Sequence, residues 1–313
     1  MKKVIRLGSR GSPLALIQAE DVKKKLIAAH PNFEAEAEIE IVPIRTTGDW
    51  KPEQQERTFI EMGGNKGLFT KEIEDALETG HIDMAVHSMK DVASRLPPRL
   101  DIAALLERLD PRDAFIGRTV KTLDELAPGS TVGSSSLRRQ SQILARRPDL
   151  RVIPLRGNVD TRLKKLADGQ ADATILAVAG LQRLGAAERI SSFLETDVML
   201  PAAAQGVIGI EIRRDDNDMR VMLRPLNDAN TAACVTAERA ALRVLDGSCH
   251  TPIGSLAKIS GANTLTLEVV VAKADGTSMV RLSQSGTADK ADQIGSELGL
   301  KLKGQLPVDF FAA

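Results

Sequence analysis

The sequence predicts an α/β protein made of two lobes and a smaller C-terminal α+β domain. Three observations carry this prediction. Strand and helix signals alternate through the first third of the chain, alternate again over about residues 113–200, and give way from about Asn227 to an alanine-rich helix followed by strands. Alternating strands and helices are typical of open α/β layers, whereas strands grouped after a helix indicate an α+β unit.

The first lobe is expected to alternate strands and helices. A short strand at residues 4–7 leads through glycines to a helix at about residues 13–29, with Ser12 as N-cap and Pro13 as its first residue. The following elements are a strand at 38–44, a turn at 63–67, a helix at about 68–77 and a buried strand at 82–86.

The chain is expected to cross into the second lobe near Pro111 and to return later. The second lobe carries two strand–turn–helix units and then a strand at 173–178. A strand at 205–212 follows a small-residue break and would bring the chain back to the first lobe. In the C-terminal domain we expect a helix at 231–244, a hairpin turn at 274–277 and a last helix at 289–303.

The composition argues against several function classes. The 313 residues have a formal net charge of zero, 3% aromatic residues and no Tyr. Nucleic-acid binders are usually basic, and single-strand binders need aromatic stacking platforms, so no nucleic-acid partner is expected. The N-terminus lacks the apolar core of a secretion signal, and no apolar run reaches membrane-spanning length. We therefore expect a cytoplasmic protein without membrane contact.

Two neighbouring segments repeat one arrangement of an apolar run, a small-residue turn and arginines at the start of a helix. They are residues 130–140 and 152–162, and seven arginines but only two acidic residues lie between Arg138 and Arg162. Helix N-termini present free N–H groups, and arginine adds a planar fork that matches a carboxylate. The pattern predicts a site for a ligand with several negative charges. The arginines at strand–helix junctions are Arg10, Arg138, Arg139, Arg156 and Arg162.

Other chemically competent residues leave alternatives open. Lys90 and Asp91 follow the strand at 82–86 and would form an ordinary ion pair, or would place an ionised carboxylate near the arginine-bearing sheet edge. Cys234 is expected to be a small core residue, whereas Cys249 lies in a turn and is either inert or an attachment point. The cysteines and histidines show no metal-ligand spacing, so no metal is expected.

Eight segments, in order, resemble the porphobilinogen deaminase family. They are residues 10–16, 66–72, 85–92, 132–140, 155–159, 175–181, 201–209 and 247–254. The resemblance covers nearly the whole chain and implies two periplasmic-binding-protein-like lobes with two crossovers plus a third domain. The implied domains are 1–106 with 207–224, then 112–200, then 228–313.

The resemblance also implies an activity and a cofactor. Members of the family join four porphobilinogen molecules head to tail, release ammonia and form the linear tetrapyrrole hydroxymethylbilane. The chain grows on a dipyrromethane cofactor, which the resemblance places on Cys249 through a thioether. Porphobilinogen is thus the expected small-molecule partner, and the protein is expected to be a monomer.

The resemblance implies Asp91 as the catalytic residue, which would stabilise the positive charge that develops as ammonia leaves. The implied cofactor-binding residues are Cys249, Lys90, Asp91, Ser134, Ser136, Arg138, Arg139 and Arg162. The implied substrate-binding residues are Arg10, Ser12, Lys66, Phe69, Ser88, Arg156, Arg183, Gln205 and Gly206, the last two at an interdomain hinge.

The chain departs from the family pattern at a few positions. Ser248 stands where the family commonly has glycine, Ala93 where it usually has proline, and Asn65 lies within the glycine-rich run before Lys66. One alternative function belongs to a different class: a cytosolic anion-binding or sensor protein without catalysis. That alternative accounts for the arginines, but not for the sequence contexts of Asp91 and Cys249.

Overall fold

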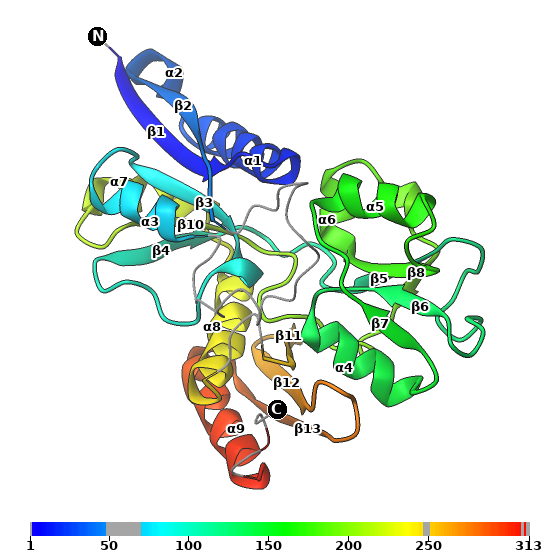
Figure 1. Cartoon of the computed structure of the whole chain (residues 1–313). Coiled ribbons are helices and arrows are strands. Elements are labelled where there is room, and N and C mark those ends of the chain that lie inside the picture. The colour runs from blue at the N-terminus through cyan, green and yellow to red at the C-terminus, as the bar shows by residue number, and fades with distance from the viewer. Residues whose placement is uncertain (1, 48–69, 247–250, 308–309, 311–313) are drawn as a thin grey trace. The chain divides into compact units, whose positions relative to one another are not determined.

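The computed structural model describes residues 2–47, 70–246, 251–307 and 310, and these divide into two compact units. The first unit holds described residues 2–47, 70–109 and 206–232, and the second holds the remainder. Two α/β lobes and a smaller C-terminal domain with its own sheet are present, which confirms the expected fold class (Figure 1).

The first unit is an α/β lobe around a five-stranded sheet. In spatial order the strands are β2 (Ala37–Ile44), β1 (Lys3–Arg10), β3 (Met84–Ser88), β10 (Ile208–Arg213) and β4 (Leu100–Leu105). β1 runs parallel to β2 and β3, whereas β10 runs antiparallel to β3 and β4. Because β10 follows the whole second sheet in the sequence, the expected return of the chain is confirmed.

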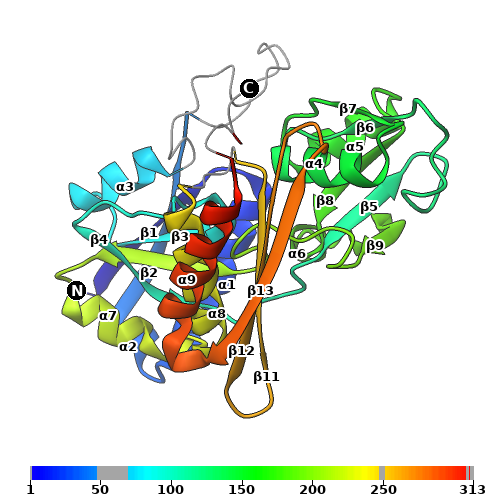
Figure 2. The ribbon, with the colours of Figure 1, turned by 90° about the horizontal axis from the view of Figure 1, so that it is seen from below.

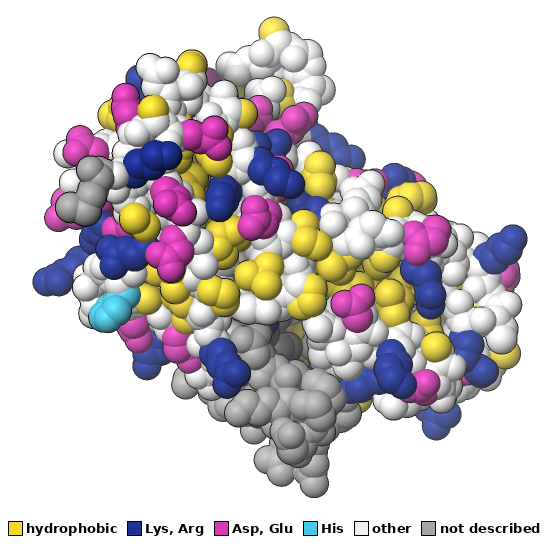
Figure 3. Space-filling view, turned by 90° about the horizontal axis from the view of Figure 1, so that it is seen from above, with side chains coloured by type: hydrophobic (Ala, Val, Ile, Leu, Met, Phe, Trp, Pro, Cys, Tyr) yellow, Lys and Arg dark blue, Asp and Glu magenta, His cyan; other side chains and the backbone are white. Residues whose placement is uncertain are grey.

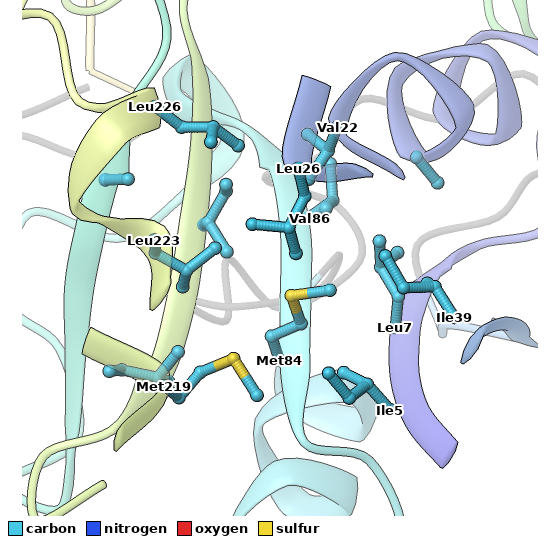
Figure 4. Close-up of a cluster of buried hydrophobic side chains, with 14 of the residues drawn as sticks. Ile5, Leu7, Val22, Leu26, Ile39, Met84, Val86, Met219, Leu223 and Leu226 are labelled. Carbon is cyan, nitrogen blue, oxygen red and sulfur yellow. The ribbon is translucent and has the colours of Figure 1, made fainter. Parts of the chain in front are cut away.

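Helices cover both faces of this sheet. They are α1 (Pro13–Ala29), α2 (Phe33–Glu36), α3 (Lys71–Glu78) and α7 (Asn217–Leu223), with 3-10 turns η1 (Met89–Asp91) and η3 (Arg224–Leu226). Ser12 caps α1 as predicted, since its Oγ accepts a hydrogen bond from the Ala15 N–H at 3.4 Å. The core on the α1 side joins apolar side chains of α1, α7, β1, β2, β3 and β10 (Figure 4).

Several predicted boundaries in this lobe were wrong. β1 continues to Arg10 because its parallel pairing with β2 extends through the glycine, and a Cβ on Gly8 would lie 2.3 Å from Ile82 Cδ1. β3 starts at Met84 because Ile82 still belongs to the turn that closes α3, where its N–H donates to the Ala76 carbonyl. Ile82 is fully buried, which explains its strand-like signal.

Two further boundaries differ from the prediction. α3 starts at Lys71, after a turn at Thr70, rather than at residue 68. β10 starts at Ile208 because the residues before it form a turn with positive φ angles, 59° at Ala204 and 88° at Gly206. Such φ angles cannot continue a strand.

The second unit contains a lobe whose five-stranded sheet repeats the same pattern of strand directions. Its strands are β7 (Arg151–Ile153), β6 (Thr131–Gly133), β8 (Ala173–Ala177), β5 (Asp113–Gly117) and β9 (Ser192–Leu194). β6 runs parallel to β7 and β8, and β5 runs antiparallel to β8 and β9. The helices are α4 (Leu137–Arg146), α5 (Val159–Ala167), α6 (Val178–Arg183) and the 3-10 turn η2 (Ala187–Arg189).

The C-terminal domain is an antiparallel three-stranded sheet with two long helices. The strands are β11 (Ile253–Ser260), β12 (Thr264–Ala272) and β13 (Met279–Thr287), with α8 (Ala229–Val244), the 3-10 turn η4 (Ala288–Lys290) and α9 (Ala291–Gln305). Cys234 is 7% exposed in this core, as predicted. The predicted hairpin joins β12 to β13, and a Cβ on its Gly276 would lie 2.4 Å from the Ala145 nitrogen of α4 (Figure 2).

The surface agrees with the neutral net charge. Positive, negative and apolar side chains are interspersed over the face shown in Figure 3. Among the described residues, no helix combines the length and apolar character that crossing a membrane requires.

Candidate active site

The first lobe places a polar set at the carboxyl edge of its sheet. β1 ends at Arg10, followed by Ser12 at the start of α1, and the parallel strand β3 ends at Ser88. Ser88 exchanges hydrogen bonds with Gln18 of α1, in which Gln18 Nε2 donates at 2.9 Å and Ser88 Oγ donates to Gln18 Oε1 at 3.0 Å. The Ser88 hydroxyl is therefore held in place by a residue that the sequence analysis did not identify.

Asp91 lies at the end of the short turn η1, directly after β3. The turn is anchored by Met89, which is 1% exposed and whose N–H donates to the Val207 carbonyl at 3.0 Å. Asp91 is half-buried, and its carboxylate makes no hydrogen bond or ion pair with the residues that the structure describes. The ordinary Lys90–Asp91 ion pair is thus not observed, although both side chains belong to this turn.

The second lobe brings the two predicted arginine segments together. β6 and β7 are adjacent and parallel, so their carboxyl ends meet at one edge. The two loops are hydrogen-bonded to each other, since the Ser134 N–H donates to the Ile153 carbonyl at 2.8 Å and the Leu155 N–H to Ser135 Oγ at 3.2 Å. The two arginine-bearing segments therefore lie side by side.

Two serines shape the turn before α4. Ser136 is the N-cap of α4, with its Oγ accepting a hydrogen bond from the Arg139 N–H at 3.5 Å. Ser134 is 5% exposed, and its Oγ accepts from the Ser136 N–H at 3.2 Å. Both hydroxyls thus keep their own hydrogen available for a further acceptor.

Arg138 and Arg139 begin α4 and are buried rather than solvated. They are 5% and 6% exposed, and both bind the fully buried carboxylate of Asp113 at the start of β5. The distances are 2.8 Å from Arg138 Nη2 to Asp113 Oδ2 and 2.7 Å from Arg139 Nη2 to Asp113 Oδ1. Burial alone would raise the pKa of the Asp113 carboxyl, but the charges and hydrogen bonds of the two guanidinium groups outweigh it and lower that pKa overall.

The remaining predicted arginines of this lobe lie in the loop after β7 and in helices α5 and α6. Arg156 is 3% exposed between β7 and α5, and its carbonyl accepts a hydrogen bond from Lys165 Nζ at 3.1 Å. Arg162 of α5 donates from Nε to the Gly157 carbonyl at 2.9 Å, and Arg183 is the last residue of α6. All three follow the parallel strands β7 and β8 at their carboxyl ends.

Gln205 and Gly206 form the turn before β10. Gln205 is 1% exposed, and its Nε2 donates to the Pro111 carbonyl at 2.7 Å and to Asp113 Oδ1 at 3.0 Å. Gly206 has a φ of 88°, and a Cβ there would lie 2.6 Å from the Leu109 carbonyl oxygen. Only glycine fits this position without strain. Three further predicted residues, Lys66, Phe69 and Cys249, lie outside the described residues.

The comparisons with known proteins agree over nearly the whole chain. Residues 5–221 match the family model described as porphobilinogen deaminase, dipyromethane cofactor binding domain, and residues 232–304 match porphobilinogen deaminase, C-terminal domain. The chain belongs to the porphobilinogen deaminase family. It is therefore a hydroxymethylbilane synthase, a transferase of tetrapyrrole biosynthesis with a dipyrromethane cofactor, and the non-catalytic alternative is not supported.

Individual relatives give the same family. The porphobilinogen deaminase of Chromobacterium violaceum is 49% identical over 302 residues, which cover 96% of this chain and 94% of the relative. The chloroplastic porphobilinogen deaminase of Oryza sativa subsp. japonica is 47% identical over 310 residues, which cover 98% and 86%. Among solved structures, the methionine-binding protein MetQ is similar at 14% identity and a TM-score of 0.44, covering 71% of this chain and 89% of its own.

Proposed function

We propose that this porphobilinogen deaminase uses Asp91 as its catalytic residue and its buried arginines to bind the carboxylates of the pyrrole chain. Each condensation forms a carbon–carbon bond, releases ammonia from the incoming substrate and a proton from the ring carbon that receives it. Positive charge therefore develops next to pyrrole N–H groups while the substrate's acetate and propionate carry negative charge. Asp91 of the first lobe has the charge opposite to the former, and the arginines of the second lobe have the charge opposite to the latter.

Asp91 is suited to stabilise the developing positive charge. Its carboxylate is half-buried and makes no hydrogen bond or ion pair within the described part of the chain, so both oxygens are available to accept pyrrole N–H groups. The anchoring of Met89 holds the turn, so little reorganisation is needed when charge develops. Lys90 on the same turn, with Ser12, Ser88 and Arg10 at the same sheet edge, is assigned to binding.

The arginine edge of the second lobe fits a ligand with several carboxylates. Arg139 Nε is buried and has no hydrogen-bond partner among the described residues, so this donor remains for a ligand. We assign Ser134, Ser136, Arg138, Arg139 and Arg162 to the cofactor, and Arg156, Arg183, Gln205 and Gly206 to the substrate. When bound, dipyrromethane supplies the free pyrrole carbon to which the first substrate is joined.

Further assignments complete the proposal. Cys249 holds the cofactor through a thioether, and Lys66 and Phe69 contact substrate. The domains are 1–106 with 207–224, then 112–200, then 228–313, and the enzyme acts as a cytoplasmic monomer without nucleic acid or membrane partners. The neutral net charge supports the absence of a nucleic-acid partner.

The observation that carries the proposal is the meeting of two arginine-bearing loops on adjacent parallel strands. The test is the intact mass of the purified protein. We expect an excess that matches two linked pyrrole units, its loss in Cys249→Ala and its retention in Cys234→Ala, which changes the buried cysteine. A wild-type chain that keeps the mass of the bare polypeptide after addition of porphobilinogen, and forms no hydroxymethylbilane, would refute the proposal.

A further inference from the structure

We infer that Asp113 is a positioning residue: it aligns Arg138 and Arg139 and leaves the pair with one net positive charge, suited to one carboxylate of the pyrrole chain. This inference rests on the proposed function, because it deepens the role of the same arginines. Asp113 itself would touch neither substrate nor cofactor, since its carboxylate is fully buried and occupied by protein donors.

The alignment comes from the contacts that both arginines and Gln205 make with one carboxylate. Asp113 Oδ2 binds Arg138 Nη2 at 2.8 Å, and Oδ1 binds Arg139 Nη2 at 2.7 Å and Gln205 Nε2 at 3.0 Å. Each oxygen is thereby used to fix a different arginine. Hydrogen bonds between ionised partners are short and strong, so these contacts restrict both guanidinium planes.

Main-chain carbonyls accept hydrogen bonds from the second terminal nitrogen, Nη1, of each guanidinium group. Arg138 Nη1 donates to the Leu200 carbonyl at 2.8 Å, and Arg139 Nη1 donates to the Ile175 carbonyl at 2.9 Å. Leu200 is in turn held by Gln142, which accepts from the Leu200 N–H at 2.8 Å. Each arginine is thus held at two points, and Arg139 Nε remains buried without a partner among the described residues.

The charge balance follows from the same contacts. Two guanidinium groups and one carboxylate leave a formal charge of plus one in a place where both arginines are at least nine-tenths buried. Burial lowers the pKa of Arg138, as does its neighbour Arg139, and Asp113 opposes both effects. An uncompensated buried charge is costly, so a single ligand carboxylate would complete the neutralisation. Without Asp113, two adjacent cations would repel each other and require two carboxylates.

The position of Asp113 in the fold supports this role. It pairs with Ala177 in the antiparallel register of β5 and β8, at the carboxyl end of β8 where the arginine loops lie. Asp172 provides a matched control, because it precedes β8 at the opposite edge and accepts hydrogen bonds from Thr131 N and Oγ1 at 2.8 and 2.9 Å. Asp172→Asn makes the same chemical change in the same lobe, away from Arg138 and Arg139, at a carboxylate whose ion pair is with Arg118.

The experiment compares cofactor loading in Asp113→Asn, Asp172→Asn and wild-type protein. Each apoprotein is mixed with porphobilinogen, and the gain of two linked pyrrole units is followed by intact mass over a range of NaCl concentrations. For Asp113→Asn we expect loading at least about thirtyfold slower, the lower end of what loss of a buried charge partner costs. We also expect a steeper salt dependence, because its receptor carries one more positive charge. Asp172→Asn should load like wild type.

Two outcomes would overturn the inference. One is an Asp113→Asn protein that loads at the wild-type rate with the wild-type salt dependence, which would mean that the cluster only stabilises the lobe. The other applies if Asp113→Asn does not fold: Gln205→Met removes the uncharged donor to Asp113 together with the hydrogen bonds to the Pro111 and Arg112 carbonyls, and it should slow loading. Because Gln205 is also assigned to the substrate, the outcome that counts is an unchanged loading rate, which would contradict the positioning role. Failure of wild-type protein to load would instead count against the proposed function.

Discussion

The two α/β lobes share one pattern of strand directions but carry opposite chemistry at the carboxyl edges of their sheets. In the first lobe a half-buried carboxylate, Asp91, ends a short turn and has no partner among the described residues. In the second lobe Arg138 and Arg139 are buried and already bound to their own counter-ion, Asp113. A common scaffold thus supports an available anion in one lobe and, in the other, a preformed pair of arginines that Asp113 leaves with one net positive charge.

The cluster of ionisable side chains in the first lobe consists mainly of carboxylates, whereas that of the second lobe consists mainly of arginines. His87 of β3 and Glu211 of β10 are 5% and 0% exposed, and His87 Nε2 lies 2.9 Å from Glu211 Oε2. Glu74 of α3 is close enough for the Glu211 charge to affect its pKa. This cluster has two carboxylates and one histidine, whereas the cluster of the second lobe has two arginines and one carboxylate. Removing one charged side chain should therefore affect stability and activity differently in the two lobes.

The largest effect is expected at the edge of the first lobe. Asp91→Ala should keep its fold but lose turnover by a factor on the order of 10²–10³ or more, because a preorganised charge at the reacting centre is removed. Steady-state formation of hydroxymethylbilane measures turnover, and thermal unfolding reports the fold. Asp101→Asn, which disrupts a surface ion pair with Arg220 in the same lobe, is the control. Near wild-type turnover in Asp91→Ala would remove Asp91 from the mechanism.

In the second lobe, loss of an arginine should lower both the stability of the protein and its incorporation of the cofactor. Arg139→Leu leaves Asp113 buried without one partner, which typically costs about 3–5 kcal/mol, and should abolish cofactor incorporation. Arg146→Leu on the same helix breaks only an exposed pair with Asp124, worth about 0–1 kcal/mol. Chemical denaturation and intact mass distinguish the two variants. Arg139→Lys, which keeps the charge but loses the planar fork, should lie between them. A fully loaded Arg139→Leu protein would contradict the assignment.

A smaller effect is expected from the loop that carries Arg156. Gly157 has a φ of 115°, and a Cβ there would lie 2.6 Å from Thr161 Cγ2. Gly157→Ala should cost about 1–3 kcal/mol through backbone strain and should raise the KM for porphobilinogen. Gly169→Ala is the control, because its φ is 80° but nothing lies within 4 Å of the added methyl group. If Gly157→Ala and Gly169→Ala lost equal stability and kept the wild-type KM, the loop that carries Arg156 would have no role in substrate binding.

The smallest effect tests the acidic cluster of the first lobe. Burial raises the pKa of Glu74, as does the charge of Glu211, against a hydrogen bond from Thr70. A carboxyl with a raised folded-state pKa disfavours folding once it is ionised, so the penalty is absent at low pH and complete above that pKa. Glu74→Gln should raise stability at neutral pH by no more than about 0.5 kcal/mol, because the group is partly exposed. The melting temperatures of wild type and Glu74→Gln should converge below pH 4.5, the ordinary glutamate pKa. A difference between them that widens below this pH would contradict the explanation.

The arginine loops were predictable from the sequence, whereas their counter-ion was not. Each loop follows an apolar strand directly, and parallel neighbours bring such loops to one edge. Asp113 lies 26 residues from Arg139 and starts an antiparallel strand that no local pattern pairs with β8. Gln18 and Ser88 are 70 residues apart, so their contact likewise depends on tertiary packing.

Local signals also misplaced some element boundaries, for one physical reason. Ile82 is apolar and fully buried, but it packs from a turn rather than from a strand. Gly8 and Ser9 are small residues that signal a loop, yet they continue β1 because only a small residue fits beside Ile82. In both cases the conformation depends on burial, which can be inferred only indirectly from the sequence. Lys66, Phe69 and Cys249 remain predictions because they lie outside the described residues.

The place of β10 in the first sheet also bears on the order of folding. β10 lies between β3 and β4, so the hydrogen bonds on the inner edges of both strands wait for residues 208–213 to be synthesised. The second sheet is complete within residues 113–194, and its closure spans much shorter loops. We therefore expect the later lobe to fold first, both on the ribosome and on refolding. Pulse-labelling hydrogen exchange should protect β6 and β8 before β3; earlier protection of β3 would reverse that order.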